Sequence, residues 1–150
     1  MLSKKDARIL SELRQDARKK LTEISRSTGI PTSTIHERLK RFVAGGLRLT
    51  SVLNYPGMHM PLQCWVFVKA KARKKDALKA YLEQLVYVNV LLAVNSSADY
   101  VAECVFSTLK QQHVVLEELK SLGKVQVYPV IEEVGRELVD PLKLVKKRNI

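Results

Sequence analysis

The chain has 150 residues, of which 26 are Lys or Arg and 15 are Asp or Glu, so its formal net charge is +11. Its 46% apolar and 27% charged residues are typical of a globular protein, and its length excludes a large multidomain enzyme. The longest apolar run, residues 86–94, is interrupted by Asn89 and is far shorter than the ~20 residues that span a bilayer, and the N-terminus lacks an apolar signal core. We therefore expect a soluble cytoplasmic protein.

Cysteines and histidines are few and widely separated in the sequence. Cys64 and Cys104 belong to no CxxC motif, so we expect them to be small buried side chains. His36, His59 and His113 do not come within metal-ligand spacing of one another or of a cysteine. The sequence therefore predicts no metal and no cofactor.

The positive charge is concentrated near the N-terminus. Residues 1–50 contain 12 Lys or Arg and 5 Asp or Glu, whereas residues 51–150 contain 14 and 10. A clustered excess of cations favours a polyanion as binding partner. The first third of the chain is thus the expected nucleic-acid-binding module.

Three helices are predicted within residues 1–47. The first follows an N-cap at Ser3 and carries apolar residues at helical spacing. The second covers about residues 21–28 and ends at Gly29, which can adopt the left-handed conformation that closes a helix. The third begins with a Thr or Ser N-cap at about residues 32–33 and ends at Ala44. Two short helices joined by a tight turn containing glycine form a helix-turn-helix, the predicted DNA-binding domain.

The third helix has two distinct faces. At about 100° per residue, Ile35, Leu39 and Phe42 lie together and can pack against the other helices. The opposite face and its flank carry the side chains that we expect to contact DNA: Ser33, Thr34, His36, Glu37, Lys40 and Arg41. Residues near the N-terminus of a recognition helix read base edges, and cations contact phosphates. A merely solvated helix face is the alternative interpretation, which the surrounding positive charge disfavours.

Two strings in this region resemble the Lrp/AsnC (feast/famine) transcription regulators. Residues 6–18, DARILSELRQDAR, resemble the opening Asp-x-x-Ile-Leu-x-x-Leu-x-x-x-x-Arg pattern of that family. Residues 29–42, GIPTSTIHERLKRF, resemble its recognition helix, and Gly46-Leu47 matches its exit into a linker. The resemblance implies a regulator that binds double-stranded DNA as a homodimer or higher homo-oligomer.

The remaining residues predict a second domain of different architecture. Residues 48–61 contain Asn54-Tyr55-Pro56-Gly57 and a second proline, which is typical of a linker with a turn. Strands are expected over residues 62–72, 87–94, 100–106 and 125–131, with helices over 74–86 and 109–122. This β-α-β-β-α-β order predicts a ferredoxin-like domain over residues 62–133 and an α+β fold class. Residues 134–150 are expected to form a basic, partly ordered tail.

The resemblance also implies an effector site at the turn before the third strand. Family members carry a Gly-Asp-Tyr-Asp segment there, near an amino-acid site between subunits, and the matching residues are Ala98, Asp99 and Tyr100, followed by Val101. Glycine lets a ligand approach the backbone closely, and a second carboxylate could hold an amino group. Because both are replaced, we expect little or no response to common amino acids and a possible effector of another kind.

The leading interpretation is a sequence-specific transcription regulator that is not an enzyme. One alternative is a tetrapyrrole (siroheme-type) decarboxylase, because such enzymes resemble Lrp/AsnC proteins in fold. They need cationic and histidine groups around an anionic macrocycle, whereas the three histidines here lie on separate elements. Another alternative is a nucleoid-like architectural protein, which would share the basic charge but bind DNA with little sequence preference.

Overall fold

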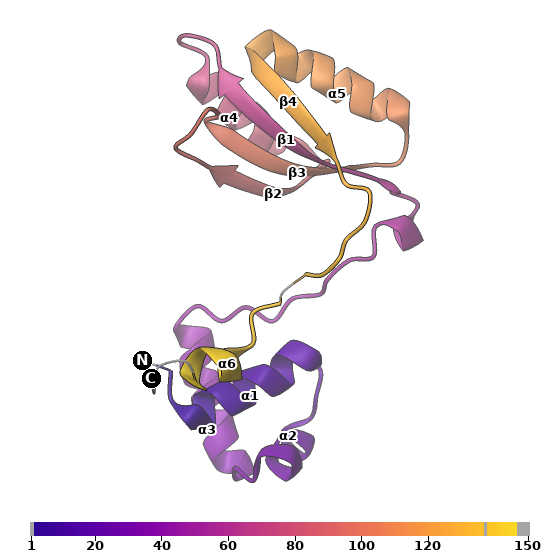
Figure 1. The fold of residues 1–150 in the computed structure, drawn as a ribbon. Helices are drawn as coiled ribbons and strands as arrows, with labels where there is room; N and C mark the ends of the chain where they lie inside the picture. Colours follow the sequence, from indigo (N-terminus) through magenta and orange to yellow (C-terminus); the bar gives the residue numbers. More distant parts are fainter. Residues whose placement is uncertain (1, 137, 147–150) are drawn as a thin grey trace. The chain divides into compact units, whose positions relative to one another are not determined.

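The computed structural model describes residues 2–136 and 138–146, which form two compact units (Figure 1). The first unit consists of residues 2–52, 135–136 and 138–146, and the second consists of residues 53–134. Each unit has a hydrophobic core of its own. Each helix in these residues is too short or too polar to cross a bilayer.

The first unit contains the three predicted N-terminal helices, α1 (Lys4–Gln15), α2 (Leu21–Thr28) and α3 (Thr32–Ala44). Ser3 is the N-cap of α1, as predicted, and its hydroxyl accepts the Asp6 N–H at 3.1 Å. Gly29 closes α2 with a φ of 70°, which is the left-handed conformation that glycine favours.

The start of α3 differs from the expected Thr or Ser cap. Its N-cap is Pro31, whose carbonyl accepts the Ile35 N–H at 3.0 Å, and no side chain caps this end. The first helical residue is therefore Thr32, and the hydroxyl side chains lie inside the first turn instead of capping it. Ser33 is consequently inside the helix, where its side chain is exposed.

The core of the first unit joins all three helices. Ile9 and Leu13 of α1, Ile24 of α2 and Ile35 of α3 are buried together with Ile30 of the turn. Leu21, Leu39 and Phe42 pack against the edge of this cluster. The predicted apolar face of α3 therefore holds the helix in place and leaves its opposite face outward.

A short C-terminal helix, α6 (Pro141–Lys146), also belongs to the first unit and packs on α1. Asp140 begins it, because the carboxylate of this residue accepts the Leu142 N–H at 2.9 Å. Ser11 of α1 lies within 3.4 Å of the same carboxylate oxygen. The described part of the segment that the sequence indicated as a tail thus ends in an additional helix on the N-terminal unit.

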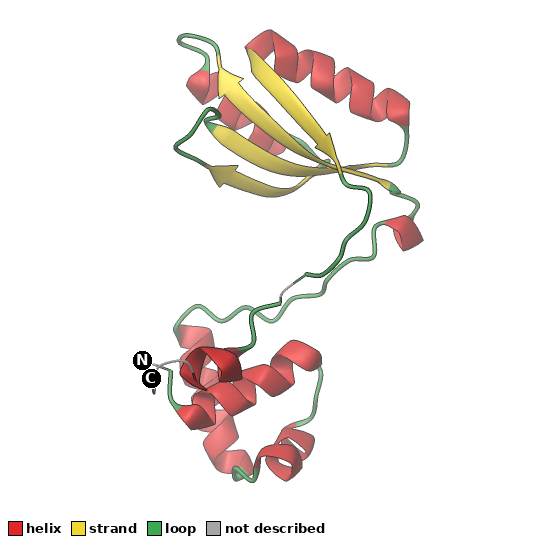
Figure 2. Cartoon of the chain, in the orientation of Figure 1, coloured by secondary structure: helices red, strands yellow, loops and turns green. Residues whose placement is uncertain are grey.

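The second unit is a sheet with helices, as the sequence predicts (Figure 2). It contains η1 (Pro56–Met58), β1 (Leu62–Ala70), α4 (Lys75–Gln84), β2 (Val88–Ala93), β3 (Tyr100–Phe106), α5 (Leu109–Leu122) and β4 (Gly123–Pro129). The four strands are antiparallel neighbours in the order β2-β3-β1-β4, which is the ferredoxin-like arrangement, so the α+β fold class is confirmed. β4 begins at Gly123, two residues earlier than expected, because α5 leads directly into it.

Helices α4 and α5 cover one face of this sheet. Leu78 and Leu82 of α4 and Val115 and Leu119 of α5 pack against alternate residues of β1 and β3. Cys64 and Cys104 lie opposite each other on that face and are fully buried, as expected. Burial raises the pKa of both thiols, that of Cys104 to about 12. Within the second unit, the other face of the sheet has no helix over it.

Candidate nucleic-acid interface

The outward face of α3 is the candidate DNA-contacting surface. Ser33, His36, Glu37, Lys40 and Arg41 are exposed on it. Thr34, the remaining residue that the sequence singles out, is half-buried beside them. The fold therefore brings all six side chains onto one helix, with hydroxyl groups in its first turn and both cations in its second half.

The charges on this face are only weakly neutralised. Glu37 Oε1 lies 4.0 Å from both Lys40 Nζ and His36 Nδ1, and all three side chains are more than half exposed. Such exposed pairs contribute little and are screened by salt. For Arg41, no acidic partner occurs among the described residues. Lys40 and Arg41 are thus free to contact phosphate groups.

Arg38 lies on the same helix but points away from this face. Its Nη1 donates a hydrogen bond to Ser3 Oγ at 3.2 Å and another to the Asp6 carboxylate at the start of α1. The side chains of Arg38 and Asp6 are only 20% and 15% exposed. Burial opposes ionisation of Asp6, but the hydrogen bonds from Ser3 and Arg38 outweigh it and lower its pKa.

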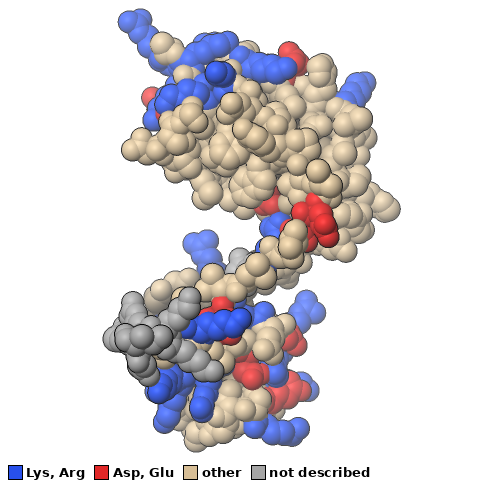
Figure 3. Space-filling view, in the orientation of Figure 1, with Lys and Arg blue, Asp and Glu red and all other residues tan. Residues whose placement is uncertain are grey.

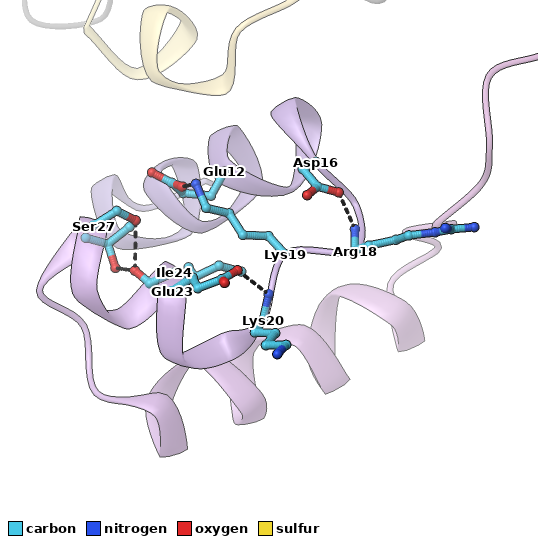
Figure 4. A network of polar contacts seen from close by, with 9 residues as sticks. Glu12, Asp16, Arg18, Lys19, Lys20, Glu23, Ile24 and Ser27 are labelled. Atoms are coloured by element: carbon cyan, nitrogen blue, oxygen red, sulfur yellow. Dashed lines mark hydrogen bonds and ion pairs between the residues drawn. The ribbon is translucent and has the colours of Figure 1, made fainter. Parts of the chain in front are cut away.

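A second ion pair fixes the segment between α1 and α2 (Figure 4). Lys19 donates to the carboxylate of Glu12, and this contact lowers the pKa of Glu12. Asp16 accepts the Arg18 N–H at 2.8 Å, and Glu23 accepts the Lys20 N–H at 3.1 Å. The basic stretch before α2 is therefore partly used to position the helix-turn-helix.

The turn that the sequence indicates as an effector site connects β2 and β3. Ala98 and Tyr100 are buried, at 3% and 7% exposure, and Tyr100 belongs to the core of the second unit. Asp99 Oδ1 lies 3.2 Å from Lys69 Nζ and 3.1 Å from Lys75 Nζ, while its Oδ2 accepts the Ala70 N–H at 3.0 Å. The hydrogen bond from Lys75, followed by that from the Ala70 N–H, lowers the pKa of Asp99.

Sequence reasoning missed the acid–base pairs that position these residues. Asp6 and Arg38 are 32 positions apart, and Asp99 is 30 positions from Lys69. A single sequence carries no periodic signal for contacts at such separations, since only the tertiary fold brings the partners together. The helical spacing of Arg38, at the edge of the apolar face, was the one available indication that it points inward.

Comparison with known proteins identifies relatives of both units. An AsnC-type helix-turn-helix domain model matches residues 2–42. An uncharacterised HTH-type transcriptional regulator of Pyrococcus abyssi is 26% identical over 148 residues, covering 97% of this chain and 86% of the relative. The HTH-type transcriptional regulator FL11 of Pyrococcus furiosus is 31% identical over 97 residues, 63% of each protein.

A solved structure of another regulator has the same two-domain fold. The transcriptional regulator from Neisseria meningitidis in complex with L-methionine has a TM-score of 0.85 at 22% identity, covering 97% of this chain and 99% of that one. The helix-turn-helix match and the HTH-type regulators among the relatives show that the chain is a DNA-binding transcription regulator, which agrees with the outward basic face of α3. Residues 2–42 thus match an AsnC-type helix-turn-helix domain, and over nearly its whole length the chain is similar to HTH-type transcriptional regulators.

Proposed function

We propose that this regulator is sequence-specific and reads DNA with the outward face of α3. The observation that carries the proposal is that all six candidate residues share one helix whose opposite side is fixed in the core. Ser33, Thr34, His36 and Glu37 supply hydrogen-bonding groups for base edges in the major groove. Lys40 and Arg41 supply charge for phosphates, which gives affinity without sequence information.

We propose that the working form is a homodimer or larger homo-oligomer built on the second unit. The sheet face opposite α4 and α5 carries large apolar side chains, among them Trp65, Leu92 and Tyr128. Leu92 and Tyr128 are 49% and 53% exposed, although Tyr128 packs edge-to-face on Phe67 at 5.3 Å between ring centroids. A second copy of this face would remove these surfaces from water and pair two recognition helices for a palindromic site.

We further propose a small-molecule effector at the turn of Ala98, Asp99 and Tyr100, although not an ordinary amino acid. The solved Neisseria relative is a complex with L-methionine, which supports a ligand in this fold. In the present chain, however, both oxygens of the Asp99 carboxylate are already occupied by Lys69, Lys75 and the Ala70 N–H. An incoming amino group would have to displace these partners, so we expect amino acids to bind weakly.

We propose no catalytic role and expect the protein in the compartment that holds the DNA, the cytoplasm. His36 lies on α3, His59 follows η1 and His113 lies in α5, so the three histidines come from separate elements and share no motif of an active site. The exposed cations of α3 have no use in such an enzyme. They support the DNA-binding proposal over the enzymatic alternative.

Selection of bound duplexes from a random DNA pool tests the proposal. We expect enrichment of a two-fold-related sequence, and a log–log salt dependence whose slope reports the phosphate contacts. Matched affinities for selected and scrambled DNA would instead favour the architectural alternative. No binding to either DNA at low salt would contradict the assignment of α3 as a DNA-reading helix.

A further inference from the structure

The second unit carries a basic end far from the recognition helix in sequence. Figure 3 shows Lys and Arg side chains gathered over the end of this unit where β1 continues into α4. Six exposed cations lie on β1, the following loop, the start of α4 and β4: Lys69, Lys71, Arg73, Lys74, Lys75 and Lys124. Such a concentration raises the local concentration of anions.

Several of these cations also have partners within the chain. Lys71 Nζ donates to the carbonyl oxygens of Lys120 and Ser121 at 2.9 and 3.1 Å, and Lys74 Nζ donates to that of Ser121 at 3.2 Å. These contacts provide hydrogen-bond donors for the last carbonyl oxygens of α5, but they neutralise neither ammonium group. The Asp99 carboxylate is shared by Lys69 and Lys75, so it balances only one of the two charges.

Lys69 and Lys124 occupy directly opposite positions in the antiparallel pairing of β1 and β4. Both are exposed, and like charges placed opposite each other destabilise a sheet. Among the described residues, Lys124 has no acidic partner. The sheet therefore holds an uncompensated cation next to a second lysine, an arrangement that an anion bound between them would stabilise.

A small pocket lies at this lysine pair. Its volume is about 60 Å³, and its lining residues are Phe67, Lys69, Ser97, Ala98, Lys124 and Gln126. Phe67 and Ala98 give it apolar surface, while Ser97 and Gln126 can donate hydrogen bonds. Ala98 also belongs to the proposed effector turn. Cations with neutral donors around a hollow form a chemical environment that suits a carboxylate or phosphate group.

We propose that this pocket binds a small anionic effector through a carboxylate or phosphate group held between Lys69 and Lys124. The inference rests on the proposed function, because it assigns the ligand class of the effector turn. The contacts of Asp99 support the same ligand class. The amino group of an amino acid would require a free carboxylate, but Asp99 is already paired with lysines, and the pocket presents ammonium groups. A hollow of this size accommodates one anionic group of a small molecule, which favours such a ligand over the continuous backbone of DNA.

Calorimetric titration of the full chain with inorganic phosphate, succinate and leucine tests the proposal. We expect saturable binding of phosphate or succinate, with the tighter of the two identifying the anionic group, and weaker or no binding of leucine. Lys124→Gln should weaken anion binding by about tenfold, the loss expected when one charge-assisted hydrogen bond is removed. This variant should retain its fold, because the substitution relieves a repulsion.

Lys110→Gln is the matched control. Lys110 is an exposed lysine in the first turn of α5, whereas β4 follows the last turn of that helix. Equal weakening in both variants, tighter binding of leucine, or no saturable binding of either anion would each overturn the proposal. A Lys124→Gln variant that binds small anions normally but binds DNA weakly would also overturn the proposal. Anion binding that persists in a Lys40→Ala/Arg41→Ala variant separates this site from the DNA interface, so either proposal can fail alone.

Discussion

Arg38 of α3 is hydrogen-bonded to Asp6 in the first turn of α1, so the helix that we propose to read DNA is fixed to the start of the first helix of its domain. The Arg38 side chain also contacts Ser3, the N-cap of α1. One guanidinium thus joins a helix start to the helix that we propose to enter the major groove. Its neighbours Lys40 and Arg41 remain exposed.

We expect Arg38→Gln to destabilise the first unit by about 2 kcal/mol, because it leaves a mostly buried carboxylate without its charged partner. Urea unfolding followed by circular dichroism measures this change. Arg41→Gln removes the same charge from an exposed position and should leave the unfolding midpoint nearly unchanged. Equal stabilities of the two variants would show that the Asp6–Arg38 contact contributes little.

Acid should destabilise the same unit. The folded-state pKa values of Asp6 and Glu12 lie below their ordinary values of 3.8 and 4.5. A carboxyl with a lowered folded pKa stabilises the protein above its unfolded pKa, and this contribution is lost as pH falls through the folded value. Stability should therefore be constant with respect to these groups above about pH 5 and fall below about pH 4. Asp6→Asn should make that acid limb shallower in a pH series of thermal unfolding curves.

The double variant Lys40→Ala/Arg41→Ala should fold normally and bind all DNA sequences more weakly. If each cation contacts one phosphate, the slope of log affinity against log salt should decrease by roughly two units. Glu37→Gln should instead change sequence preference in a selection experiment while leaving the salt slope nearly intact. Fluorescence anisotropy at several salt concentrations measures the first effect, and normal binding by the folded double variant would contradict the interface.

Leu92→Lys should weaken the proposed assembly of the second unit. A lysine in an apolar interface would lose much of its hydration, which should raise the dissociation constant by about 100-fold or more. Sedimentation velocity of the full chain at several concentrations measures the change. Val86→Lys is the control, because Val86 is 84% exposed in the connection between α4 and β2. A wild-type chain that sediments as a monomer at micromolar concentration would refute the proposed assembly.

Asp140→Ala should lower the stability of the first unit by about 1 kcal/mol, the typical contribution of a helix cap. The substitution removes the acceptor of the Leu142 N–H at the start of α6 and the contact with Ser11 of α1. Differential scanning calorimetry would detect a lower Tm. Lys143→Ala changes an exposed residue of the same helix and should have little effect. Truncation of the chain after Val134 should cost more, since it removes the helix that packs on α1.

The sequence by itself determined the elements whose side chains repeat with a simple period. The spacing of Ile35, Leu39 and Phe42 gave the inner face of α3, and Gly29 indicated the end of α2 because glycine favours the left-handed conformation that commonly closes a helix. Alternating apolar residues likewise predicted the strands of the ferredoxin-like unit. These features depend on neighbours a few residues apart, so local physics is sufficient to specify them.

Only the tertiary structure decided which charged groups are available for binding. Arg38 and Arg41 are three positions apart and chemically identical, yet the fold places one beside Asp6 and leaves the other exposed. Asp99 similarly looks like a free carboxylate in the sequence, whereas β1 and α4 bring Lys69 and Lys75 to it. The packing of α6 on α1 is of the same kind. All three features depend on contacts between residues that are distant in sequence. Such contacts form only when helices and strands pack, so no periodic pattern in the sequence records them.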